Sequence, residues 1–97
     1  MASYEHVDFL LGERKEVCIS VYNQCREPFD ITSATWVLKK GDEIEKQGNC
    51  EITHKSEIES ILTALIQPMA KRAEYVLEFT YDIPPQILKK NIQVRVK

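Results

Sequence analysis

The residues that could do chemistry in this 97-residue chain are few and widely spaced along it. Neither of the two histidines, His6 and His54, has a serine, cysteine or carboxylate at a spacing that identifies a nucleophile and its base. The 15 carboxylates are scattered, so no catalytic acid and base pair stands out. The three glycines, Gly12, Gly41 and Gly48, fall at expected turns rather than in a phosphate-binding loop. We therefore expect no catalytic residues and no enzymatic activity.

The three cysteines are odd in number and lack the Cys-x-x-Cys spacing of a zinc or redox site. This pattern favours free thiols in a reducing compartment over a disulfide framework for Cys18, Cys25 and Cys50. Cys50 and His54 lie four residues apart and could in principle bind a metal, but structural zinc needs four convergent ligands. We expect three free thiols, no metal site, no cofactor and no small-molecule ligand.

Composition indicates a single globular domain that spans residues 1–97. The chain is 43% hydrophobic and 29% charged, and its length suits one hydrophobic core. Its first residues hold neither a basic segment nor a long apolar run, so we expect a cytoplasmic chain without a signal peptide or membrane contact. A net charge of −2 argues against binding nucleic acid.

The charge is unevenly distributed along the chain. Residues 1–67 hold 12 acidic and 7 basic side chains, whereas residues 68–97 hold 3 acidic and 6 basic ones. Two differently solvated faces explain this asymmetry, and it could also let copies of the chain associate head to tail.

The stretch from Phe29 to Lys40 is predicted to be a turn that leads into a strand. Pro28 supplies turn chemistry, and Ala34, Trp36 and Leu38 then fall on one face at a period of two residues. The single tryptophan of the chain is therefore expected to point into the core.

The same alternation predicts further strands, with one apolar face each. They are expected at Val7–Leu11, Val17–Tyr22, Tyr75–Tyr81 and Ile92–Val96. In the first of these Val7, Phe9 and Leu11 point inward, and in the second Cys18 points away from the core. Polar or proline-rich loops are expected at Asn23–Pro28 and Asp82–Gln86.

Two short strands, Glu43–Lys46 and Cys50–His54, are expected to form a hairpin. The turn between them is placed at Gln47–Asn49, because glycine and asparagine favour turns. Ile44 and Ile52 are their expected core contacts, and the remaining charged residues would protect an exposed sheet edge.

Residues 56–69 are ambiguous between helix and strand. Ile58, Leu62 and Leu65 follow helical spacing, and a serine at position 56 with a glutamate at 59 resembles a capping box. Against a helix stand Pro68 and a β-branched run, in a chain whose other segments all indicate strands. We predict a strand over Ile61–Ile66.

Seven to eight short strands without a dependable helix indicate an all-β protein, an immunoglobulin-like Greek-key β-sandwich. Tyr75 begins the strand that would carry a tyrosine corner in this fold, in which a buried phenol bonds to upstream backbone. That strand has no cysteine, so the immunoglobulin disulfide is not expected. The predicted shared core consists of Ile19, Trp36, Tyr75, Leu77, Phe79 and Val94.

Two segments resemble small immunoglobulin-like domains encoded in phages and prophages, including the N-terminal domains of upper-baseplate proteins. PFDITSATWVLKKGDEIEKQG resembles their Asp-(Leu/Ile)-Thr-x-Ala strand, turn and hairpin. The matching residues are Asp30, Ile31, Thr32 and Ala34 in the motif, Trp36 and Leu38 at its apolar positions and Gly41 in its turn.

AEYVLEFTYDI resembles a later Gly-x-Tyr-x-Leu-x-Phe strand of the same domains, through Tyr75, Leu77 and Phe79. Ala73 stands where glycine is usual, which leaves the geometry of the preceding turn open. The resemblance implies a virion or prophage structural protein without a cofactor, made in the host cytoplasm and incorporated into a virion.

We therefore predict a non-enzymatic assembly module whose partners are other structural proteins or copies of itself. The alternative is a binding module that recognises a carbohydrate or a host-surface protein through its end loops. For assembly, the expected interface lies at sheet edges, where partners can add strands. Its candidate residues are Glu43, Ile44, Glu45, Ile92, Val94 and Arg95.

Overall fold

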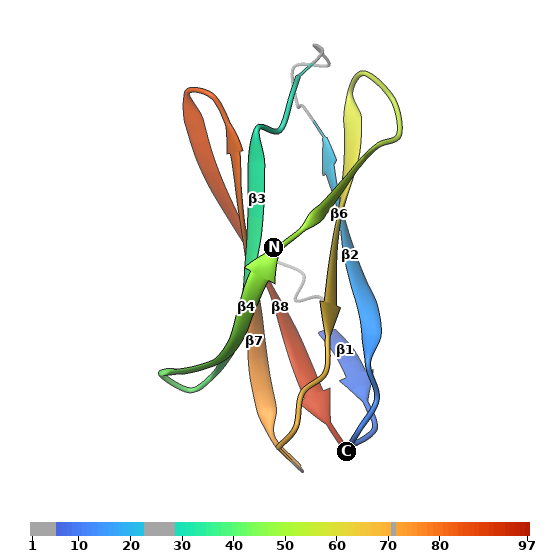
Figure 1. Ribbon diagram of the computed structural model, residues 1–97, viewed down its shortest axis with the longest axis vertical. Helices are drawn as coiled ribbons and strands as arrows, with labels where there is room; N and C mark the ends of the chain where they lie inside the picture. The colour runs from blue at the N-terminus through green and yellow to red at the C-terminus, as the bar shows by residue number, and fades with distance from the viewer. Residues whose placement is uncertain (1–5, 23–28, 71) are drawn as a thin grey trace, which may run out of the picture.

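Eight strands in two facing sheets make up the computed structural model, which describes residues 6–22, 29–70 and 72–97 (Figure 1). The larger sheet has the order β1-β8-β7-β3-β4 and the smaller one the order β2-β6-β5. The predicted all-β sandwich is therefore confirmed, whereas the Asn23–Pro28 connection and Cys25 lie outside the described residues. The strands are β1 His6–Phe9, β2 Lys15–Tyr22, β3 Ser33–Lys40, β4 Glu43–Asn49, β5 Glu51–His54, β6 Glu59–Ile66, β7 Glu74–Ile83 and β8 Gln86–Val96.

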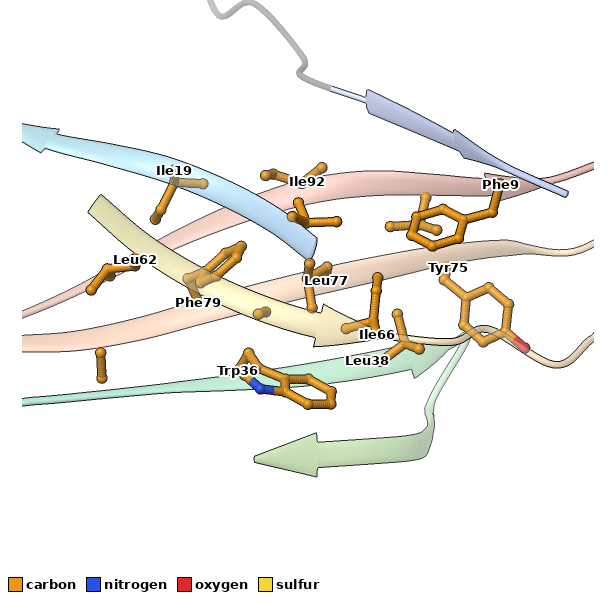
Figure 2. Packing of buried hydrophobic residues seen from close by; sticks show 14 of the residues in the cluster. Phe9, Ile19, Trp36, Leu38, Leu62, Ile66, Tyr75, Leu77, Phe79 and Ile92 are labelled. Carbon is orange, nitrogen blue, oxygen red and sulfur yellow. The ribbon is translucent and has the colours of Figure 1, made fainter. Parts of the chain in front are cut away.

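The core fills the space between the two sheets, as the alternating pattern predicts. Trp36 is 6% exposed, and the other predicted core residues are at most 3% exposed. Figure 2 shows core side chains converging from both sheets, with Ile19, Leu62 and Ile66 from the small sheet and Trp36, Tyr75, Leu77, Phe79 and Ile92 from the large one. The predicted core is confirmed for Ile19, Trp36, Tyr75, Leu77, Phe79 and Val94.

The ambiguous segment is a strand, as predicted. β6 lies at the centre of the small sheet, where β2 pairs with one side of it and β5 with the other. Leu62, Ala64 and Ile66 point into the core and are almost completely buried. Pairing on both sides supplies backbone hydrogen bonds that override the local helical pattern.

The predicted hairpin between Glu43 and His54 is wrong. β4 pairs with β3 in the large sheet, and β5 pairs with β6 in the small sheet, so the chain crosses between sheets at Cys50. The Cys50 N–H donates to the Ala34 carbonyl at 2.9 Å, which anchors this crossing. Ile52 is half-buried against the core, as expected.

Gly48 is not a turn residue but lies within β4, directly opposite Trp36. A side-chain carbon placed on Gly48 would come within 3.1 Å of the Trp36 indole. Glycine therefore stands at this position because the indole extends over β4, as Figure 2 shows.

Ile44 is 54% exposed, so its predicted core contact is wrong. The register between β3 and β4 shifts at Leu38 and Lys39, which leaves Glu45 as an extra residue in β4. Beyond this bulge Ile44 pairs with Lys39 and shares its outward face.

β1 ends at Phe9, two residues earlier than predicted. The Glu13 N–H donates to the Leu10 carbonyl at 3.0 Å, and Gly12 adopts a φ of 90°, so the chain turns at these residues. Leu11 is therefore 48% exposed instead of buried. β1 runs parallel to β8, from His6 opposite Gln93 to Phe9 opposite Val96.

β7 and β8 form a long antiparallel hairpin whose turn is shorter than the predicted loop. Asp82 pairs with Ile87, and only Pro84 and Pro85 separate the two strands. β8 therefore begins six residues before the predicted Ile92–Val96 strand. Its first half includes Lys89 and Lys90, so apolar and polar residues do not alternate there and the sequence pattern does not indicate a strand.

Candidate functional site

The expected interface residues on β4 lie at a free edge of the large sheet. β4 is the last strand of that sheet and pairs only with β3 among the described residues. Glu43 and Ile44 are exposed there, so the edge presents one apolar side chain among charged ones. Such charges limit uncontrolled strand pairing while leaving the side chains available to a partner.

Two of the expected interface residues on β8 are wrong. β8 is not an edge at this point, because β1 pairs with it on one side and β7 on the other. Ile92 and Val94 are 2% and 1% exposed, so neither can contact a partner in the folded chain. Arg95 points outward, and its Nε lies 3.7 Å from Glu74 Oε1.

Glu45, the bulged residue of β4, is exposed, but its carboxylate accepts hydrogen bonds from within the chain. Tyr75 Oη donates to Glu45 Oε1 at 2.7 Å, and the Met69 N–H donates to Oε2 at 3.4 Å. The Ala70 N–H donates to Tyr75 Oη at 3.0 Å, so the phenol has the upstream backbone partner that a tyrosine corner requires. The carboxylate at the bulge thus links β4 to Tyr75 and to the segment before β7.

We expect Tyr75→Phe to lower the free energy of unfolding by about 1 kcal/mol, because the Ala70 N–H and the Glu45 carboxylate lose their shared partner. Chemical denaturation monitored by Trp36 fluorescence measures this loss. Tyr22→Phe is the matched control, since the Tyr22 ring is 61% exposed and its change should stay within about 0.5 kcal/mol. Equal stability of the Tyr75→Phe variant and the parent would contradict a structural role for this hydroxyl.

Burial of the Tyr75 ring, together with the hydrogen bond to Glu45, raises the pKa of the phenol. A pKa raised in the folded state means that the phenol's contribution is complete below its unfolded value of about 10. That contribution is lost as pH rises through the folded pKa. We therefore expect stability to fall more steeply above pH 10 in the parent than in Tyr75→Phe, measured by denaturation at a series of pH values.

Cys18 and Cys50 are free thiols, and Cys18 faces outward as predicted, with its Sγ 3.3 Å from Thr63 Oγ1. Burial raises the pKa of the Cys50 thiol to about 11 from an ordinary value of 9.0. Two pKa units reduce the reactive thiolate about 100-fold near neutral pH.

We expect Cys50 to react with a chromogenic disulfide reagent about 100-fold more slowly in the native chain than in the denatured chain at pH 8. The measurement uses a Cys18→Ser, Cys25→Ser variant, in which Cys50 is the single thiol. The denatured, non-reduced parent should give three thiols, and a count of one would reveal a disulfide. Equal native and denatured rates would show that Cys50 is not shielded.

His54 has a hydroxyl partner that the sequence does not reveal. His54 on β5 lies opposite Ser60 on β6, and the distance from His54 Nδ1 to Ser60 Oγ is 3.1 Å. Ser60 is 1% exposed, so a substrate cannot reach its hydroxyl in this conformation. The pair orients the imidazole at the end of the sandwich, and only the register of two strands could have predicted it.

An open cleft of about 970 Å³ lies at that end. Three segments line it: the one before β3, the β5–β6 connection and the β7–β8 turn. The Phe29 N–H donates to the Glu57 carbonyl at 3.3 Å, and the Thr32 N–H donates to the Asp82 carbonyl at 3.0 Å, which ties the segments together. The lining includes Asp30, Thr32, His54, Glu57, Pro84 and Gln86.

Within the described ranges, no group of three or more histidine, cysteine or acidic side chains is placed to hold a metal ion. The same part of the chain contains no helix long and apolar enough to cross a membrane.

No protein-family model matches the sequence, and no curated protein sequence matches it either. The fold is similar to part of an engineered protein solved as a structural-genomics target, with 16% identity and a TM-score of 0.68 over 99% of this chain. This chain spans 18% of that longer one. It is also similar to murine CRIg, with 19% identity and a TM-score of 0.50 over 96% of this chain and 92% of CRIg.

The core has residues at positions that are typical of immunoglobulin-like sandwiches. β3 carries Trp36, Tyr75 is the second residue of β7, and Leu77 lies two residues further on, where antibody domains have their second cysteine. The chain is an all-β protein with an immunoglobulin-like β-sandwich fold.

Proposed function

We propose that this chain is a non-enzymatic structural or assembly module of the phage or prophage type, which acts through contacts with other structural proteins or copies of itself. The observation that carries the proposal is the free edge of β4, where Ile44 is 54% exposed between charged neighbours. A free edge with one accessible apolar side chain suits a regulated protein contact better than a reaction.

The resemblance to phage domains supports the same proposal. The matched residues Ile31, Ala34 and Leu38 are buried, so they maintain the fold and leave its surface available for contacts. We further propose that the chain is made in the host cytoplasm and is incorporated into a virion.

Native mass measurement at low and at physiological salt, alone and with the products of neighbouring genes, tests this function. We expect complexes that weaken as salt rises, because the Debye length shortens to about 8 Å at physiological ionic strength. Ile44→Arg should reduce them, whereas Ile87→Arg, a change at an isoleucine that is 70% exposed on β8, is the matched control. A chain that stays monomeric at low salt and binds no neighbouring product would refute the proposal.

A second candidate function is recognition of a carbohydrate or a host-surface protein, and the end cleft is the observation that favours it. Carboxylate, hydroxyl and amide groups line this cleft beside Phe29, a combination that can hydrogen-bond and stack a sugar. A glycan array with the parent and His54→Ala tests it. Binding that His54→Ala removes would support this function, and an array without signal would oppose carbohydrate recognition.

A further inference from the structure

The small sheet has one long edge, at β2, which the sequence analysis did not identify. β2 is the outermost strand of that sheet, and only β6 pairs with it among the described residues (Figure 1). All eight residues of β2 are in register with β6, so the strand is regular along its length. Within the part of the chain that the structure describes, one side of its backbone therefore presents hydrogen-bonding groups without a partner strand.

Most of this edge lacks the features that protect the others. β4 has a bulge and the charges of Glu43, Glu45 and Lys46, and β1 and β5 each have only four residues. By contrast, β2 carries charges only at its first two residues, Lys15 and Glu16, and the stretch from Val17 to Tyr22 includes no charge, no proline and no glycine. A long unprotected edge in a folded protein is a site for adding a strand.

We propose that β2 pairs antiparallel with β2 of a second copy, with the two Cys18 residues opposite each other. The two small sheets would join into one sheet of six strands, related by a two-fold axis. This inference rests on the proposed assembly role, and it names a second copy of the chain as the partner at this edge.

Self-complementarity of the strand argues for a second copy. In a two-fold antiparallel pair, opposing residues lie on the same sheet face. With Cys18 opposite Cys18, Glu16 faces Ser20 of the second copy, and Arg14 faces its Tyr22. The Tyr22 ring is 61% exposed and can receive the guanidinium, and the Ser20 hydroxyl can donate to the carboxylate.

The core-side residues fit this register as well. Val17 faces Ile19 of the second copy, and Lys15 faces Val21. The Lys15 ammonium is already held by the Asp8 carbonyl at 2.7 Å and lies 3.6 Å from Glu13 Oε1, so it need not enter the new contact. No like charges oppose each other in this arrangement. At β4, a two-fold pairing centred on Ile44 would place Glu43 opposite Glu45, and one centred on Lys46 would place two lysines opposite each other.

Strand pairing from Lys15 to Val21 buries less than the roughly 1,200 Å² of a stable standard interface. We therefore expect a reversible dimer that forms between micromolar and millimolar concentrations.

Cross-linking tests the register directly. In a Cys25→Ser, Cys50→Ser variant, diamide should oxidise two Cys18 thiols to one interchain disulfide. Diamide takes up the two protons and two electrons that the thiols release. The matched control moves the thiol along the same exposed face, with Cys18→Ser and Ser20→Cys in the same background. We expect at least about tenfold slower dimer formation in the control, because position 20 faces position 16 of the second copy. Equal rates would show random collision and overturn the proposed register.

A charge variant tests the edge without oxidation. Cys18→Lys places two ammonium groups opposite each other, so sedimentation should show at least about tenfold weaker dimerisation than in the parent. Thr63→Lys is the control for the effect of an added lysine on the fold of the small sheet. Thr63 lies opposite Cys18 on the neighbouring strand β6, away from the free edge. Trp36 fluorescence verifies that both variants fold.

The results separate this inference from the proposed function. Association that Ile44→Arg abolishes and Cys18→Lys leaves unchanged would overturn pairing at β2 and retain an assembly role. Dimerisation that only Cys18→Lys removes would support pairing at β2. A parent that is monomeric at millimolar concentration would overturn pairing at β2, whether or not it binds another protein.

Discussion

Trp36→Ala is expected to lower the free energy of unfolding by about 3 to 5 kcal/mol, because a large indole leaves a cavity that its neighbours cannot fill. Trp36 is 6% exposed and lies between Phe79 on β7 and Gly48 on β4. A loss of this size is a large share of the stability of a small domain. Chemical denaturation followed by far-ultraviolet circular dichroism measures it without the tryptophan signal.

Val37→Ala is the matched control for this prediction. Val37 is the next residue on β3, but it points to the outer face and is only half-buried. Its truncation should cost about 1 kcal/mol or less, since no enclosed cavity forms. Similar losses in the two variants would mean that the core is not centred on the indole.

Gly48→Val is expected to destabilise the protein by about 1 to 3 kcal/mol, through overpacking against Trp36. Even the first side-chain carbon would lie 3.1 Å from the indole, and the two methyl groups of valine extend further. β-propensity alone predicts the opposite sign, because valine favours strands and glycine does not. The measurement is again the midpoint of chemical denaturation.

Gln47→Val separates these two effects. Gln47 precedes Gly48 on β4 and pairs with Val37 on the outer face, where a valine meets no indole. We expect this variant to be as stable as the parent or slightly more stable. If Gly48→Val also gained stability, the close approach of Trp36 to β4 would not constrain the strand.

Strand faces could be predicted from the sequence because the side-chain period of a strand is two residues. Trp36, Leu77 and Phe79 each fall on a face whose neighbours at that period are also apolar, so their burial follows from local pattern. The predicted strand over Ile61–Ile66 is confirmed for a related reason, since β6 is buried on its inner face along its whole length.

Turns and partners were harder to predict, because they depend on contacts between distant residues. Gly48 is a residue type that favours turns, yet its place in β4 is determined by Trp36, which lies 12 residues earlier. Ile44 is an apolar residue type that is typical of a core, but the bulge at Glu45 places its side chain on the outward face of the sheet. No local signal marks either effect.

The candidate surfaces depend on strand order, which the sequence does not encode locally. Ile92 and Val94 are apolar residues near the end of the chain and look like an edge strand, but β1 returns to pair beside them. β2 looks like an interior strand and lies at an edge. The His54–Ser60 pair likewise requires the register of β5 with β6.

The parallel pairing of β1 with β8 determines how the molecule would respond to mechanical load. A pull on the start of β1 and on the end of β8 acts in opposite directions along two strands that run side by side. The hydrogen bonds that join residues 6–9 of β1 to residues 93–96 of β8 would then all be loaded in shear at the same time. The backbone bond from the Lys97 N–H to the Phe9 carbonyl, 2.9 Å long, extends this clasp by one residue. Tension applied through both ends would thus meet a stiff resistance that yields abruptly, whereas peeling β4 from its free edge would break one bond at a time.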